Sequence, residues 1–375
     1  MNDILSQRIF CTFFIFFMAL LGFLGTLSSA CAITNVFEIR NVVVDVTAET
    51  ASLARKKALI RAPLVAFQRL LKRLTLNEDH ERLPRLDHDE ISSLVSSFDV
   101  ADEKTASKRY LAKLSYIFKQ TEVRNLLKNF NLQFAETLSK PVLILPVYQA
   151  VGTIVLWDDP NPWRDAWARV VGFEGMVPLV NPVGDLADFG SIGPEQAIQG
   201  DRNRLQVIAE RYKTGDVIVA YAKLRLDAAI SRQRLDVSVT RYGNDPEPIT
   251  EELIYHQNET EPVSVFLGRA ASAVGKDIEN KWKHDNLLKL NWPNVAAIAV
   301  PITGIKDWLL IQKRLKGVAL IRNLVLVLLA LDEARVNVHY VGEPEQLRVA
   351  LGQVDLSMVQ EEGEWVIYLA DLLKP

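Results

Sequence analysis

The sequence contains only two cysteines among its 375 residues, Cys11 and Cys31, and both precede residue 33. A chain cut after Ala32 would contain no thiol, which excludes disulfides, a thiol nucleophile and a thiolate metal site. An excess of basic charge is also lacking, because the formal net charge is -3. Nucleic-acid binders normally present a large basic face, so nucleic acid is not expected as a partner.

Motifs of catalytic sites are lacking as well. The stretch GRAASAVGKD, residues 268–277, has six residues between its glycines instead of the four of a phosphate-binding loop, and Asp277 stands where that loop has Ser or Thr. FGSIG, residues 189–193, lacks the spacing of a serine-hydrolase elbow. We therefore predict no catalytic residue and no cofactor, and interpret the chain as non-enzymatic.

Histidine is scarce and forms no HExxH zinc motif. The five histidines are His80, His88, His256, His284 and His339. Two of them lie in NEDHERLPRLDHDE, residues 77–90, but Pro84 between them keeps the two rings off a shared helix face. The acids considered with them are Asp79, Asp87 and Asp89. A solvated loop followed by a helix start is the preferred interpretation, and no metal ligand is predicted.

The amino terminus carries one long uncharged run, IFCTFFIFFMALLGFLGTL, from Ile9 to Leu27. SSACA follows, with Ala30 and Ala32 in the small-x-small pattern that signal peptidase accepts. We expect a signal peptide over residues 1–32 and a periplasmic product. Because the run approaches the length of a membrane span, an uncleaved inner-membrane anchor is the alternative.

Length and composition predict a folded chain of three small domains. A typical domain has about 100 to 200 residues, and 49% of the residues here are hydrophobic. Changes of pattern place the domains at residues 35–140, 141–290 and 291–375. The expected fold class is α/β and α+β, with helices packed on mixed sheets.

The first predicted domain, of α+β class, opens with the strand pattern VFEIRNVVVDVT and the long helix pattern TAETASLARKKALIRAPLVAFQRLLKRL. Small residues from Ala54 to Ala66 give this helix a narrow side that can press on a sheet, and Pro63 should kink or split it. Its basic residues are interpreted as a solvated face: Arg55, Lys56, Lys57, Arg61, Arg69, Lys72 and Arg73. A helix from DHDEISSLVSSF, a strand KRYLAKLSYIFK and a helix TEVRNLLKNF follow.

The second predicted domain begins with the buried-strand pattern PVLILPVYQ. A Pro- and Gly-rich loop is expected at residues 173–201. DRNRLQVIAERYKTGDVIVAYAKLRL then predicts a helix, a turn and a strand. RQRLDVSVTRYG and EELIYHQ predict two more strands, and PVSVFLGRAASAVGKDIENKWK predicts a closing amphipathic helix. The pattern indicates a mixed sheet covered by helices.

The third predicted domain has the order βαββαβ, which is the ferredoxin-like split arrangement. Its strand patterns are NVAAIAVPI, VALIRNLVLVLLALD, ARVNVHYVG and WVIYLA, and its helix patterns are GIKDWLLIQKRLKG and EPEQLRVALGQ. The apolar run LVLVLLAL, residues 324–331, is far shorter than a membrane span and is expected to be a buried strand.

The most unusual stretch is LWDDPNPWRDAW, residues 156–167. Asn161 is a predicted helix N-cap and Pro162 the first helical residue, so that Trp163 and Trp167 are i, i+4 neighbours on one helix face. The aspartates before the helix, Asp158 and Asp159, can accept hydrogen bonds from its amino end. We prefer the interpretation that this stretch anchors a helix to the sheet.

Two other uses of this stretch stay open. Its candidate binding residues are Trp157, Asp158, Asp159, Trp163 and Trp167. A ligand groove or glycan-stacking ledge would need at least one exposed indole. A metal site or a glycosidase-like carboxylate pair would need a second acid from elsewhere in the chain.

The exported part of the chain resembles, over essentially its full length, an uncharacterised family of bacterial exported proteins described as a domain of unknown function. The likeness is carried by VVVDVTAETASLARKKALIRAPLVAFQRLLKRL, KRYLAKLSYIF, PVLILPVY followed by LWDDPNPWRDAW, and VHYVGEPEQLRVALGQ. This resemblance brings no known activity and no assigned functional residues.

The middle segment is also similar to the amino-terminal domain of TolB and to other periplasmic assembly proteins, including the T-ring component of some flagella. PVLILP and VIAERYKTGDVIVAYAKLRL carry this likeness, which implies a binding surface without catalysis. We therefore expect an adaptor or scaffold that binds envelope proteins. The alternative is an envelope ligand or glycan binder, or a hydrolase, that uses residues 157–167. Membrane contact is expected only through an uncleaved amino-terminal segment.

Overall fold

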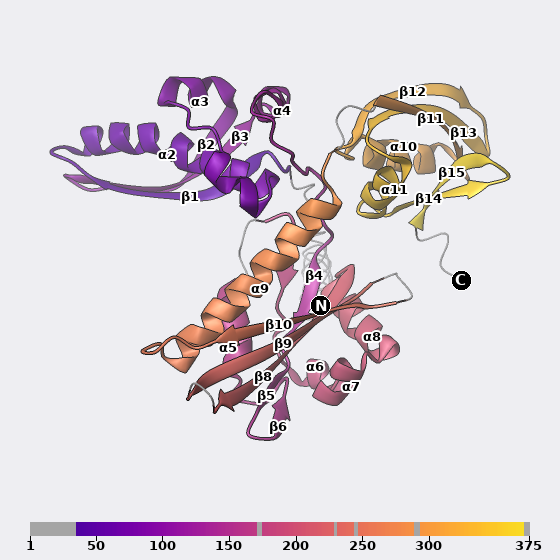
Figure 1. Cartoon of the computed structure of the whole chain (residues 1–375). Coiled ribbons are helices and arrows are strands. Elements are labelled where there is room, and N and C mark those ends of the chain that lie inside the picture. The colour runs from indigo at the N-terminus through magenta and orange to yellow at the C-terminus, as the bar shows by residue number, and fades with distance from the viewer. Residues whose placement is uncertain (1–34, 171–174, 229–230, 244–246, 289–292, 371–375) are drawn as a thin grey trace, which may run out of the picture. The chain divides into compact units, whose positions relative to one another are not determined.

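A computed structural model describes residues 35–170, 175–228, 231–243, 247–288 and 293–370. The expected signal peptide lies outside these described residues. Three β-sheets of three, seven and five strands, with helices packed on them, make up the described part (Figure 1). The expectation of a mixed α/β chain is therefore confirmed, and each sheet falls within one of the three expected ranges. No helix in the described part is both long and apolar enough to cross a membrane.

The first part contains a three-stranded antiparallel sheet of order β1-β3-β2. Its elements are β1 (Glu38–Thr47), α2 (Ala51–Leu74), a 3-10 helix (Asn77–Arg82), α3 (His88–Leu94), β2 (Val95–Thr105), β3 (Arg109–Phe118) and α4 (Gln120–Asn129). Helix α2 contacts β1 and β3, and its alanine stripe from Ala54 to Ala66 is fully buried, as predicted. It continues through Pro63 without being split.

Two details of this part differ from the expectation. Arg73 is buried, because its guanidinium donates to the carbonyl oxygens of Val36 at 2.9 Å and Glu38 at 2.6 Å, so it does not belong to a solvated face. The helix expected from Asp87 begins there with the predicted capping box, but it ends at Leu94. The residues that follow form strand β2, where tertiary pairing with β3 outweighs local preference.

The second part contains the seven-stranded sheet, ordered β10-β9-β8-β4-β7 with the hairpin β5-β6 beside β8. Its strands are β4 (Val142–Leu145), β5 (Tyr148–Ala150), β6 (Thr153–Val155), β7 (Leu179–Val180), β8 (Asp216–Asp227), β9 (Arg232–Tyr242) and β10 (Ile249–His256). Its helices are α5 (Pro162–Val170), α6 (Leu186–Ser191), α7 (Pro194–Gln199), α8 (Arg202–Tyr212) and α9 (Val263–Asp285). The range expected to be loop thus contains the short helices α6 and α7.

Strand β4 is buried on both faces, as its continuous apolar pattern predicts. Val142 and Ile144 face the core that includes Trp163 and the residues of α9. Leu143, on the opposite face, belongs to a second core that includes Ile208 of α8. The sheet therefore carries helices on both faces. The tryptophan-rich stretch contributes to both cores, because Trp163 and Trp167 belong to the first and Trp157 to the second.

The third part contains a five-stranded sheet of order β12-β13-β11-β15-β14. Its elements are β11 (Pro293–Pro301), α10 (Ile305–Lys316), β12 (Ile321–Leu329), β13 (Glu333–Val341), α11 (Pro344–Gly352), β14 (Leu356–Glu361) and β15 (Glu364–Leu369). The observed order is βαββαββ, so it differs from the expected βαββαβ by one additional strand, β14, before the last strand. Strand β15 turns back from β14 in a hairpin and pairs parallel to β11.

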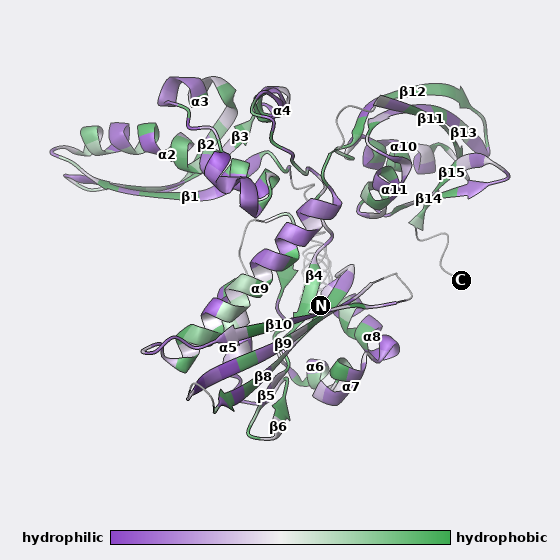
Figure 2. Ribbon diagram, in the orientation of Figure 1, coloured by the Kyte–Doolittle hydropathy of each residue, from purple (hydrophilic) through white to green (hydrophobic). Residues whose placement is uncertain are grey.

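The apolar run of this part is not buried as expected. Strand β12 lies at the edge of the sheet, and the side chains from Val325 to Leu329 are all exposed. Figure 2 shows the apolar colouring along this edge strand. A sequence pattern cannot separate a central strand from an edge strand, because both can be continuously apolar.

Candidate binding surface beside the tryptophan-rich stretch

The tryptophan-rich stretch forms the helix start that its sequence predicts. Helix α5 begins at Pro162, and the Asn161 side chain accepts a hydrogen bond from the backbone N–H of Arg164 at 3.0 Å. The Asn161 amide nitrogen also donates to the Leu156 carbonyl at 3.0 Å, so the buried cap residue ties the helix to the preceding chain. The predicted N-cap is confirmed.

All three indoles of this stretch are buried. Trp163 and Trp167 have no exposed surface and pack edge to face, with ring centroids 5.8 Å apart, and Trp157 is 4% exposed. The Trp163 N–H donates to the Ala220 carbonyl of β8 at 2.9 Å, which joins α5 to the sheet. This burial fits the anchoring interpretation, and the condition for a glycan-stacking ledge is not met at these three residues.

The two aspartates of the stretch lie outside the core. Asp158 is exposed, and the exposed carboxylate of Asp159 pairs with the Arg164 guanidinium at 2.5 Å. The acceptor at the amino end of α5 is therefore Asn161, and Asp159 contacts a side chain of the helix instead. Among the described residues, no group of three or more His, Cys, Asp or Glu side chains is placed to hold a metal ion.

The exposed apolar surface lies next to these anchors. The side chains of Val183, Leu186 and Phe189 are 78%, 90% and 46% exposed, and we call these three residues the α6 patch. The Phe189 ring packs against the Trp157 indole, with centroids 6.2 Å apart. Trp157 is held in turn by a 2.7 Å hydrogen bond from its indole N–H to the Ile192 carbonyl. The buried tryptophan thus supports an exposed ring.

A buried carboxylate fixes the backbone beneath the α6 patch. Asp188 has no exposed surface and accepts hydrogen bonds from the Gly184 N–H at 2.8 Å, the Tyr212 hydroxyl at 2.6 Å and Arg211 Nε at 2.9 Å. The Tyr212 oxygen also accepts from the Val183 N–H at 2.7 Å. Burial and the Asp188 hydrogen bond raise the pKa of Tyr212, which keeps its hydroxyl a donor.

This arrangement holds the α6 patch rigid before any partner binds. Hydrogen bonds from α8 reach the patch segment at both ends, and Asp185 caps α6 by accepting from the N–H groups of Ala187 and Asp188. Binding through a preorganised surface costs little conformational entropy. The sequence contained one indication of helix α6, the i, i+3 spacing of Leu186 and Phe189 after the N-cap Asp185, but the prolines and glycines around it favoured a loop.

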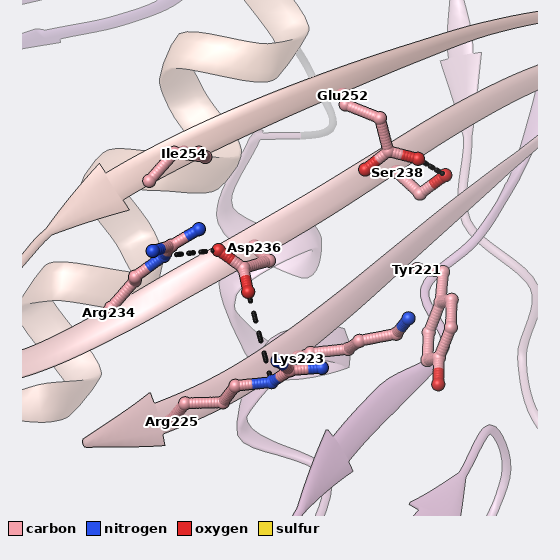
Figure 3. A pocket seen from close by; sticks show the side chains of 8 residues that line it. All are labelled: Tyr221, Lys223, Arg225, Arg234, Asp236, Ser238, Glu252 and Ile254. Carbon is pink, nitrogen blue, oxygen red and sulfur yellow. Dashed lines mark hydrogen bonds and ion pairs between the residues drawn. The ribbon is translucent and has the colours of Figure 1, made fainter. Parts of the chain in front are cut away.

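A second surface is the open part of the seven-stranded sheet (Figure 3). Its lining residues are Tyr221, Lys223 and Arg225 of β8, Arg234, Asp236 and Ser238 of β9, and Glu252 and Ile254 of β10. Asp236 accepts from Arg234 at 2.6 Å and lies 3.8 Å from Arg225, and the Ser238 hydroxyl donates to Glu252 at 2.7 Å. The Arg225–Asp236 and Ser238–Glu252 contacts join neighbouring strands, whereas Arg234 and Asp236 pair along β9, an arrangement usual on a solvated sheet face.

The two histidines considered for a metal site have different surroundings. His88 is the first residue of α3, and its Nδ1 lies 3.1 Å from the Ile60 carbonyl oxygen. His80 lies in the 3-10 helix, where burial lowers its pKa and the nearby Lys283 ammonium lowers it further.

Comparison with known proteins finds no matching family model, no matching curated protein and no matching solved structure.

Proposed function

We propose that the chain is an exported, non-enzymatic protein of the cell envelope that works as an adaptor or scaffold through protein contacts. The observation that carries the proposal is the α6 patch, three exposed apolar side chains on a segment fixed by the buried Asp188. A rigid apolar cluster of this kind suits a central contact of a protein interface.

The sequence adds the compartment to this proposal. The apolar run and the Ala30–Ala32 pattern favour export with removal of residues 1–32, and the uncleaved anchor is the alternative. The resemblance of the middle segment to the amino-terminal domain of TolB favours a binding role for the part that carries the α6 patch. The ledge alternative is less well supported, because Trp157, Trp163 and Trp167 are buried.

We also propose that the third part is a variant of the ferredoxin-like arrangement. The run β11-α10-β12-β13-α11 follows the expected order, and the hairpin β14-β15 stands in place of a single last strand.

The proposal is tested by photo-crosslinking in intact cells. A photoreactive amino acid in place of Leu186 should form a discrete adduct with one envelope protein, identified by mass spectrometry. Phe189→Asp should abolish that adduct, because a desolvated carboxylate is costly in an apolar contact. The matched control carries the photoreactive residue at Leu226, which is also exposed and lies in the same part of the chain. An absence of protein adducts, or identical adducts at both positions, would overturn the proposal.

A further inference from the structure

Strand β12 presents an unusually apolar edge. Five apolar residues of β12 and one residue just after the strand have exposed side chains, with exposed fractions between 42% and 92%. They are Val325, Leu326, Val327, Leu328, Leu329 and Leu331. In the sheet order β12 is the last strand at its end, and no other described strand pairs with its outer side. Its outer backbone N–H and C=O groups are available to another strand.

The exposed side chains lie on both faces of the sheet. Val325 is opposite Asn337 and Leu328 is opposite Arg335, which places these two on the face without buried residues from β13. Leu326 is opposite the buried Val336, on the face that carries the helices. Both faces of the edge are therefore apolar, so a strand added beside β12 would have apolar neighbours on either face of the sheet.

Other edge strands of the described part contain charged residues. These are Asp99, Asp102, Glu103 and Lys104 on β2, Asp45 on β1, Glu251 and Glu252 on β10, and Glu361 on β14. In contrast, no charged residue occurs from Leu324 to Leu331, a range that covers β12 after Arg322 and Asn323 and the two residues that follow the strand. Proteins normally place charges on free sheet edges to prevent association, so this edge has the composition of a covered one.

We propose that a second copy of this chain covers β12, with the two strands paired antiparallel about a two-fold axis. A two-fold interface uses the same surface on both copies, and an uncharged apolar edge is complementary to itself. The six side chains expose roughly 600 Å² on each copy, so a contact that covered all of them would bury at most about 1,200 Å² in total, the lower end for specific interfaces. Helix α10, which contacts β12, also has three exposed apolar residues, Ile305, Leu309 and Leu310.

The ladder of β12 sets where the strands meet. Register shifts fall between Ile321 and Asn323 and between Leu326 and Leu328, and bulges discourage strand addition. The regular segment between them runs from Asn323 to Leu326. Pairing is therefore centred between Leu324 and Val325, and the leucines beyond the bulge contribute apolar contact.

This inference is independent of the α6 patch, and its test uses the full chain in intact cells. Two differently tagged copies are co-expressed with a photoreactive residue in place of Val325. Irradiation should give an adduct of twice the chain mass that carries both tags. Leu326→Lys with Leu328→Lys should reduce that adduct by about tenfold, because placing charged side chains in an apolar contact is costly.

Controls separate loss of contact from loss of fold. Ile254→Lys, at an exposed position on the β10 edge, should leave the adduct unchanged. Leu331→Lys, after the end of β12, should weaken the adduct without disturbing the ladder, and circular dichroism checks the fold of each variant. The proposal is overturned if the adduct contains one tag and another protein, if only lipid is labelled, or if the lysines have no effect in folded variants.

Discussion

The buried indole of Trp157 packs against the half-exposed ring of Phe189, with ring centroids 6.2 Å apart. This contact connects the stretch with the most distinctive composition to the surface that we propose for binding. Truncation of Trp157 and truncation of Phe189 should therefore have different effects. Loss of the Trp157 indole removes the buried ring that supports Phe189, whereas loss of the Phe189 ring removes exposed contact area from the α6 patch.

The tryptophans and the aspartates of residues 157–167 should differ in their effect on stability. Trp163→Ala is expected to lower the free energy of unfolding by about 3–5 kcal/mol, because it leaves a cavity and removes the hydrogen bond to Ala220. Asp158→Ala, at an exposed position, should change it by less than about 0.5 kcal/mol. Denaturant unfolding measures both values. Equal effects of the two substitutions would contradict the anchoring interpretation.

The carboxylate of Asp188 should be required for the order of the α6 patch. Asp188→Asn is expected to cost about 2–3 kcal/mol, because hydrogen bonds to a charged group are lost or weakened within the core. Amide hydrogen exchange should also rise at Gly184, because its N–H donates a hydrogen bond to the Asp188 carboxylate. Glu210→Gln on the exposed side of α8 is the control and should leave exchange at Gly184 unchanged.

Stability should fall in mildly acidic solution because of His80. Its pKa in the folded chain is lowered from 6.5 by burial and by the Lys283 ammonium, so the unfolded chain binds the proton more readily. The contribution of His80 to the free energy of unfolding is complete above pH 6.5, the pKa of the unfolded chain. It is lost as the pH falls from 6.5 through the lower pKa of the folded chain. Urea unfolding at several pH values should show a smaller decline for His80→Asn than for the unsubstituted chain.

The matched control for this pH effect is His284→Asn, because the His284 side chain is largely exposed. It should leave the pH dependence unchanged. If both histidine variants show the same profile as the unsubstituted chain, His80 does not titrate differently in the folded and unfolded states.

Export predicts a defined new amino terminus. Cleavage after Ala32 should give a product that begins at Ile33 and contains no cysteine. Intact-mass measurement of the protein from the envelope fraction tests this. A mass that includes Met1 would instead identify the uncleaved anchor.

Local features of this chain were determined by its sequence alone. The Asn161 cap, the capping box of Asp87 and Glu90, and the spacing of the alanines on one face of α2 depend on residues close together in the sequence. Short-range hydrogen bonds and helical periodicity specify such features, so sequence reasoning can find them.

Tertiary structure alone decided which apolar residues are covered. Trp163 is buried because β8 supplies the Ala220 carbonyl and the opposing core, whereas the equally apolar Val327 is exposed because its strand lies at a sheet edge. Phe189 is exposed because Asp188 turns inward to Tyr212 and Arg211. Burial depends on strand order and on partners distant in sequence, so local pattern identified the apolar residues without determining which of them face solvent.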